Sequence, residues 1–113
     1  MVLAAALVGD PLRGAQIVAS RTTGLCVLCH AVPGVPSVHA GTIGPDLAGG
    51  GARYTKAQLR ERLVTPERFN PRTIMPSVSR TDGLHRVAST RAGQPLLEPQ
   101  QVEDVLAYLE TLR

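Results

Sequence analysis

The sequence predicts an all-α domain of three to four helices joined by long loops. Three segments combine a start signal with apolar residues at helical spacing, and no segment makes a convincing strand. The 113 residues include 11 glycines and 9 prolines, so much of the chain is expected to be irregular. A chain of this length forms one domain.

A first helix is expected from Pro11 to about Ser20. Asp10 supplies the N-cap, and proline suits the first helical position because no backbone N–H is needed there. Gly14 lies within this helix and destabilises it unless another backbone packs closely against it. Residues 1–9, before the helix, are expected to be the remnant of an apolar leader or a sequence added for expression, and residues 10–113 the single domain.

Two more helices have start signals of their own. The run Thr55-Lys56-Ala57-Gln58 is a capping-box pattern, and Pro66 ends the helix that it opens. Pro99 opens the last helix. Its apolar stripe comprises Val102, Val105, Leu106, Leu109 and Leu112.

Polar residues and loops complete the pattern. Glu103, Asp104 and Glu110 are expected to face outward from the last helix. Residues 31–53 and 66–97 have the composition of loops. Loops this long in a small domain are typical of a chain that wraps a ligand.

The identity of this ligand is indicated by the pentapeptide Cys26-Val27-Leu28-Cys29-His30. C-x-x-C-H is the attachment signature of c-type haem, and it uses both cysteines of the chain. Thiols at Cys26 and Cys29 can each add to a vinyl group of one porphyrin. His30 then comes under the iron as its proximal ligand. The motif therefore predicts one covalently attached haem c.

Two other chemistries use cysteine pairs. Structural zinc usually requires a second clustered pair of ligands, which this chain lacks. A redox dithiol sits at a strand-to-helix turn, and no alternating strands flank Cys26 and Cys29. Both remain alternatives to haem.

Composition favours a large cofactor at the centre. Aromatic residues make up only 3% of the chain, with one Phe, two Tyr and no Trp. A small chain with few large side chains needs another source of apolar bulk, which a porphyrin supplies.

The sixth coordination position of the iron decides between electron transfer and ligand chemistry. Met75 is the favoured ligand because it lies in a loop bounded by Pro76 that can cross the distal face. Lys56, His39, His85 or no residue at all are the alternatives.

A second interaction is expected at the proximal histidine. In the run Gly44-Pro45-Asp46-Leu47, the Pro45 carbonyl would accept a hydrogen bond from Nδ1–H of His30 and so fix its tautomer. An ordinary Gly-Pro turn is the alternative. No general acid, general base or nucleophile constellation is visible, so no catalytic residue is predicted.

Charge and hydropathy narrow the class of partner. The net charge is +3, with Lys56 the only lysine among twelve basic residues, and this is too modest and scattered to favour nucleic acid. No segment has the roughly twenty apolar residues of a membrane span. Because bacteria attach haem c outside the cytoplasm, the chain is expected to be periplasmic, with its export signal missing from this sequence.

These motifs together resemble the class I cytochromes c. The resemblance implies a fold in which the first and last helices cross, with Gly14 against the face that carries Leu106 and Leu109. Tyr108 matches the aromatic residue usual in the last helix.

A narrower resemblance, to the SoxX family, covers nearly the whole chain from Gly9 onward. It rests on IGPDLAGGGARY (43–54), on FNPRTIMPSVSRTDGLHRVAS (69–89) and on VEDVLAYLETL (102–112). It implies a monohaem electron-transfer subunit paired with a SoxA-type cytochrome, in a complex that oxidatively couples thiosulfate to a cysteine of the SoxYZ carrier. The subunit, no enzyme by itself, would pass electrons to a further cytochrome c.

Two rival functions remain open. The chain could be a free soluble electron shuttle without an obligate partner. It could also be a haem enzyme or gas sensor with an open sixth position.

Overall fold

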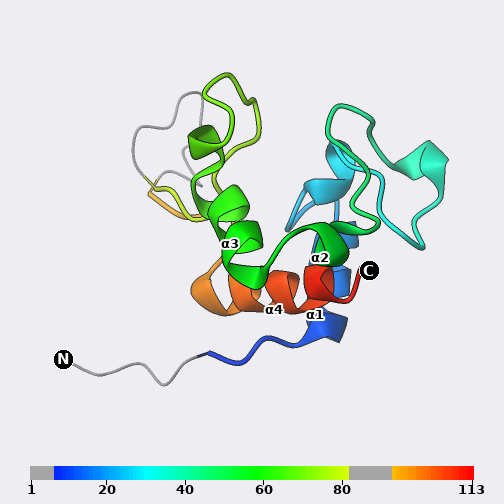
Figure 1. Ribbon diagram of the computed structural model, residues 1–113, viewed down its shortest axis with the longest axis horizontal. Coiled ribbons are helices and arrows are strands. Elements are labelled where there is room, and N and C mark those ends of the chain that lie inside the picture. The colour runs from blue at the N-terminus through cyan, green and yellow to red at the C-terminus, as the bar shows by residue number, and fades with distance from the viewer. Residues whose placement is uncertain (1–6, 82–92) are drawn as a thin grey trace.

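Four α-helices and three short 3₁₀ helices make up the regular structure of residues 7–81 and 93–113, the part described by this computed structural model (Figure 1). The α-helices are α1 (Pro11–Ala19), α2 (Gly50–Arg53), α3 (Lys56–Val64) and α4 (Pro99–Glu110), and the 3₁₀ helices are η1 (Cys26–Leu28), η2 (Ser37–His39) and η3 (Pro66–Arg68). Those two ranges contain no β-strand. The all-α prediction is confirmed, although the single turn of α2 lies in a stretch expected to be loop.

The start signals act as the sequence predicts. The Asp10 carboxylate accepts a hydrogen bond from the Leu12 N–H at 2.8 Å, which caps α1. At the start of α3, the Gln58 N–H donates to Thr55 Oγ1 at 3.2 Å, and the Thr55 N–H donates to Gln58 Oε1 at 2.8 Å. This helix ends at Val64, just before the Thr65-Pro66 pair.

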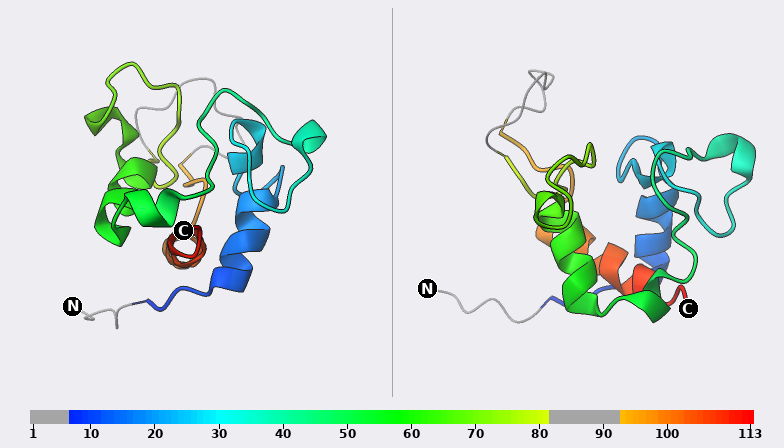
Figure 2. Two further views of the ribbon diagram at one scale, coloured as in Figure 1. Left: turned by 45° about the vertical axis from the view of Figure 1, so that its right-hand side comes forward. Right: turned by 45° about the horizontal axis from the view of Figure 1, so that its top comes forward.

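Helices α1 and α4 cross at close range, as two views of the chain make clear (Figure 2). Gly14 lies at this crossing. A Cβ atom built on it would lie 2.6 Å from the carbonyl carbon of Asp104 and 2.8 Å from Cβ of Tyr108. The crossing is thus confirmed, but Gly14 meets Asp104 and Tyr108, whereas Leu106 and Leu109 point into the core.

Asp104 does not face outward as predicted, because it is 2% exposed and lies between α4 and the start of α1. Its carboxylate accepts from the Asp10 N–H at 2.8 Å, from Gln100 Nε2 at 2.9 Å and from Arg13 Nε at 3.2 Å. Burial alone would raise the pKa of Asp104, but these hydrogen bonds and the Arg13 charge hold it below its ordinary value. The carboxylate therefore ties the two ends of the chain together.

Glu103 also departs from the outward prediction. Its side chain is 16% exposed and pairs with Arg60 at 2.6 Å and with Lys56 at 3.8 Å, so it joins α4 to α3. Glu110 is 45% exposed, in agreement with the prediction. A polar stripe next to an apolar one is ambiguous in sequence because it can face solvent or a charged neighbour.

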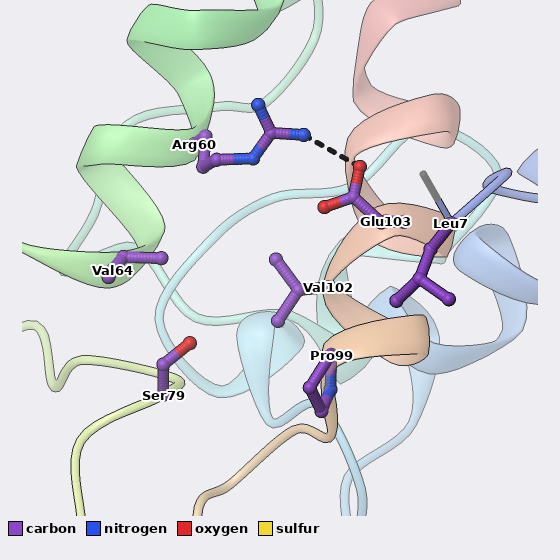
Figure 3. A pocket seen from close by; sticks show the side chains of 7 residues that line it. All are labelled: Leu7, Arg60, Val64, Ser79, Pro99, Val102 and Glu103. Atoms are coloured by element: carbon purple, nitrogen blue, oxygen red, sulfur yellow. Dashed lines mark hydrogen bonds and ion pairs between the residues drawn. The ribbon is translucent and has the colours of Figure 1, made fainter. Parts of the chain in front are cut away.

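The segment before α1 follows α4. The Val8 carbonyl accepts from Gln100 Nε2 at 2.8 Å, and a Cβ atom on Gly9 would lie 3.0 Å from Cβ of Ala107. Leu7 borders a hollow of about 400 Å³ beside the Arg60–Glu103 ion pair (Figure 3). Residues 1–9 are expected from the sequence to precede the domain. Residues 1–6 of this segment are not among the described residues.

The core is formed mainly by the inward-facing side chains of α1, α3 and α4. Its buried apolar side chains are Val18, Val27, Val32, Leu59, Leu63, Val78, Leu97, Val102, Val105, Leu106 and Leu109. No helix within residues 7–81 and 93–113 has the combined length and apolar character needed to cross a bilayer.

Replacing Asp104 by Asn tests the link between the chain ends. Asp104→Asn is expected to lower the free energy of unfolding by about 1.5–3 kcal/mol at pH 7, because it weakens hydrogen bonds to a buried charged group. The folded-state pKa of Asp104 is depressed, so its stabilisation is present above about pH 4 and is lost as the pH falls through that folded-state value. Urea unfolding followed by circular dichroism from pH 7 to pH 3 measures both effects.

Glu110→Gln is the control on the same helix. Glu110 is half-exposed and only 3.9 Å from Lys56, so its replacement should cost about 0–1 kcal/mol. Equal losses in the two variants, or a loss in Asp104→Asn that does not shrink at low pH, would contradict the role given to Asp104.

Candidate functional site

A cavity of about 910 Å³ is lined by α3 and the loop that follows it, by parts of the segments 24–30 and 43–48, and by α4. Cavities that bind small molecules and cofactors measure about 300–1,000 Å³, so this one is near the upper limit. Val18 of α1, Leu63 of α3 and Leu109 of α4 all contribute to its wall. The core side chains thus form a lining around a space that they do not fill.

The pentapeptide 26–30 forms one edge of this cavity. Residues 26–28 make the 3₁₀ turn η1, and the His30 N–H donates to the Cys26 carbonyl at 2.9 Å. Leu25, directly before the turn, has φ of 64° and is the one non-glycine residue with positive φ in the described part of the chain. This left-handed conformation is costly for leucine and persists because the surrounding structure holds it.

Both cysteine side chains line the cavity, and no disulfide joins them. Burial raises the pKa of the Cys26 thiol to about 11, so this group is neutral at physiological pH. Reactive dithiols require a lowered pKa. The environment of Cys26 therefore disfavours the redox-dithiol alternative.

The His30 ring is fixed from two sides. Its Nδ1 lies 2.6 Å from the Pro45 carbonyl oxygen, which only accepts, so Nδ1 carries the proton and Nε2 has a free lone pair. A Cβ atom on Gly44 would lie 2.6 Å from Nδ1 and 2.8 Å from Nε2 of this ring. Only glycine leaves room for the imidazole at this point, and the hydrogen bond expected from the Gly-Pro pair is present.

The loop that carries Pro45 runs beside the cysteine motif. Three backbone N–H groups of the loop, those of Gly41, Gly44 and Leu47, donate to the carbonyls of Val27, Cys29 and Ala31 at 2.8, 2.7 and 3.0 Å. The histidine and its hydrogen-bond acceptor are therefore part of one hydrogen-bonded unit.

Met75 lines the cavity from the segment after α3. Asn70 Oδ1 accepts from the Arg72 N–H at 3.0 Å, and Thr73 Oγ1 accepts from the Met75 N–H at 3.1 Å. These side chains hold two successive turns. The asparagine and threonine of the run NPRTIMP thus fix the backbone that presents the methionine.

The other candidate iron ligands are less suitably placed or lie outside the description. His39 is exposed on η2 and does not line the cavity. Lys56 of α3 pairs with Glu103 and Glu110 of α4, and it does not line the cavity either. His85 lies outside the described residues.

Sequence reasoning missed one group in the cavity wall. Cζ of Arg62 lies 4.2 Å from the ring centre of Tyr54 and 4.3 Å from that of Phe69. The signal available in the sequence was the scarcity of aromatic residues, since two of the three gather around this arginine.

The described residues fit a haem. The cavity has the size of a cofactor site, its wall is mainly apolar, two thiols lie at one edge, and the imidazole beside them keeps Nε2 available. A thioether lies in the same wall.

Comparison with known proteins agrees with this fit. The sequence profile of the family described as Cytochrome c matches residues 12–113. The chain belongs to the cytochrome c family. The crystal structure of SoxXA from P. pantotrophus contains a chain that is 35% identical to this cytochrome, with a TM-score of 0.84; the match covers 99% of this chain and 88% of that one. No curated protein sequence matches this cytochrome.

These findings confirm three predictions made from sequence. The fold is that of a class I cytochrome c, the resemblance to SoxX holds over the length of the chain, and the cofactor is one covalently bound haem c.

Gly44→Ala tests the packing around His30. The added methyl group is expected to displace the imidazole, lengthen its hydrogen bond to Pro45 and lower the free energy of unfolding of the holoprotein by about 1–3 kcal/mol. The midpoint potential should shift as well, because this hydrogen bond sets the basicity of the histidine. Denaturant unfolding and potentiometric titration measure the two effects.

Thr42→Ala is the matched control, because Thr42 is exposed in the same loop. It should leave stability and potential unchanged. If Gly44→Ala behaves like Thr42→Ala, the close contact between Gly44 and the ring does not constrain the histidine.

Proposed function

We propose that this cytochrome is the electron-transfer subunit of a complex with a SoxA-type cytochrome, as its similarity to a chain of SoxXA suggests. In that complex, thiosulfate would be coupled oxidatively to a cysteine of a SoxYZ-type carrier protein in the periplasm. This cytochrome would accept the electrons released and pass them to a further cytochrome c.

We also propose the roles of the site residues. Cys26 and Cys29 would hold the haem through two thioether bonds, His30 and Met75 would ligate its iron, and Pro45 would orient His30. The observation that carries this assignment is the cavity itself, whose wall contains both thiols, the imidazole and the thioether. The hydrogen bond from His30 Nδ1–H to Pro45 supports it, because it leaves Nε2 for the iron.

When bound, the haem supplies a one-electron Fe(III)/Fe(II) couple, and a thioether ligand favours the reduced form. The protein contributes rigidity: both axial side chains extend from backbone that is fixed by hydrogen bonds, at Gly44 and Leu47 for His30 and at Thr73 for Met75. The apolar wall excludes water and lowers the local dielectric constant. Electron transfer with a fixed ligand pair needs little rearrangement.

The cysteine content of the chain is the reason for assigning the sulfur chemistry to the partner. The chain has two cysteines, and both belong to the attachment motif. Neither remains to carry a persulfide or to act as a thiolate ligand. A partner subunit must therefore provide that chemistry.

The cavity rim supplies a surface for electron exchange. Ile43, Phe69 and Ile74 line the cavity and are 70%, 42% and 75% exposed. All three border the cavity assigned to haem, so apolar surface that the haem leaves uncovered there would be available to a partner protein. Electrons would enter or leave where these side chains bring a partner close to the haem.

Met75→Ala tests the axial assignment. The haem should stay attached, the midpoint potential should fall because a thioether that favours Fe(II) is lost, and the ferrous protein should bind CO. Absorption spectroscopy and potentiometric titration report all three. Ile74→Ala, at the exposed neighbouring position, should keep the parent potential and stay inert to CO. A Met75→Ala protein with the parent potential and no CO binding would show that Met75 is not a ligand.

Association with a SoxA-type cytochrome tests the choice between subunit and free shuttle. Size-exclusion chromatography of this 12.0-kDa chain, as holoprotein, with the SoxA-type protein of the same organism should give a single species of summed mass with both haem proteins in it. The exposed apolar rim explains why association is expected. Separate elution of the two at micromolar concentration would favour the free electron shuttle.

A further inference from the structure

Met75 is carried by a segment that is exposed over most of its length. Residues 67–80, here called the Met75 loop, begin in η3, run out from the end of α3 and return to it (Figure 1). Positions 68–72, 74 and 76 of this loop are exposed. Loops with few buried side chains open at a low cost in free energy. The place of Met75 in the cavity wall therefore depends on what fixes the base of the loop.

The returning end of the loop is anchored by its backbone and by a buried hydroxyl group. The Val78 N–H donates to the Leu63 carbonyl of α3 at 3.0 Å. Ser77 is 5% exposed, and its Oγ accepts from the Arg80 N–H at 3.1 Å. A hydroxyl that accepts from a backbone N–H further along the chain holds a tight turn. This turn begins two residues after Met75 and fixes the backbone of Arg80.

An ion pair joins the two ends of the loop. Nη2 of Arg80 donates to Oε1 of Glu67 in η3, across 13 positions of the chain. A hydrogen bond from its own backbone and the one from Arg80 hold the pKa of Glu67 below its ordinary value, so the carboxylate is ionised at neutral pH. The two side chains are 37% and 41% exposed, so salt weakens their attraction. Met75 lies between the paired residues, and opening the loop at its base separates them.

A neighbouring ion pair lacks this arrangement. Nη1 of Arg68 lies 3.4 Å from Oε1 of Glu61, and these side chains are 69% and 51% exposed. Both residues precede Met75 in the chain, so this pair joins η3 to α3 and leaves the methionine outside the span that it closes. It has the same chemistry in the same neighbourhood, without closing the Met75 loop.

We propose that Glu67 and Arg80 are positioning residues for Met75, and that their ion pair closes the base of the Met75 loop and so slows the departure of the thioether from the haem iron. This inference rests on Met75 being the sixth ligand, as proposed above. Release of the thioether needs the loop to move away from the cavity, and the ion pair opens when its two residues separate. The pair would thereby keep the sixth position closed to other ligands.

Imidazole binding to the ferric holoprotein tests the proposal, because imidazole can bind the iron only after Met75 has left it. Stopped-flow absorption at saturating imidazole, where release of the methionine limits the rate, measures this step. Arg80→Gln and Glu67→Gln should each raise the limiting rate by about 1.5- to 5-fold. Raising the salt concentration from about 0.01 M to about 1 M should accelerate the parent protein and affect either variant less. An ion pair that only stabilises the fold would change the free energy of unfolding and leave this rate unchanged.

A double-mutant cycle shows whether the two residues act through each other. The variant with both Arg80→Gln and Glu67→Gln should release methionine no faster than the faster single variant, because the pair is already broken. Arg68→Gln and Glu61→Gln, which remove the same charges from the neighbouring pair, should keep the parent rate. Parent rates in both single variants, equal acceleration in these controls, or single effects that multiply in the double variant would overturn the proposal.

Failure of this proposal can be told apart from failure of the axial assignment. A parent protein that shows the Met–Fe(III) charge-transfer band, and whose rate the substitutions leave unchanged, would overturn the role of the ion pair alone. A parent protein that lacks this band and binds imidazole as fast as Met75→Ala would overturn the assignment of Met75, and this proposal with it. If Arg80→Gln yields no holoprotein, Glu67→Gln compared with Glu61→Gln, together with the salt dependence of the parent, decides in the same way.

Discussion

The chain surrounds a space that its own side chains do not fill. With one Phe, two Tyr and no Trp it lacks the bulk for an ordinary core, and the apolar residues of α1, α3 and α4 instead line a cavity of about 910 Å³. Small domains have little stability to spare, so the porphyrin that fills this space contributes to the fold as well as to function. The long loops have the same origin, since they line this cavity and would cover a flat ligand within it.

Local signals in the sequence predicted most of this architecture. Asp10 with Pro11, and Thr55 with Gln58, specify helix starts through hydrogen bonds that depend only on neighbouring residues. The attachment pentapeptide and the Gly-Pro pair could be recognised for the same reason, because each consists of a few residues at fixed spacing. The cavity wall brings these elements together with the methionine segment.

What the sequence did not predict depends on contacts between distant segments. Asp104 belongs to a helix face that looks solvent-exposed by periodicity, yet it is buried because residues 10 and 13 supply its partners. Gly14 was assigned to the correct helix pair but to the wrong face of α4. The stacking of Arg62 was missed because Tyr54 and Phe69 come from outside its helix, and no spacing rule relates the three.

The contact between the chain ends bears on how this protein folds. The bonds of Asp104 to the Asp10 N–H and to Arg13 join positions 94 and 91 residues apart, which makes them the closure of a single long loop. The entropy lost in such a closure rises with loop length, by about 0.6 kcal/mol for each doubling. A haem bonded to the 26–30 turn and held by the 70–76 segment would act as an internal cross-link that divides this loop into shorter ones. The cofactor would then lower the entropic cost of bringing the chain ends together during folding. Attachment of haem and docking of the terminal helices would therefore be coupled in one cooperative folding step.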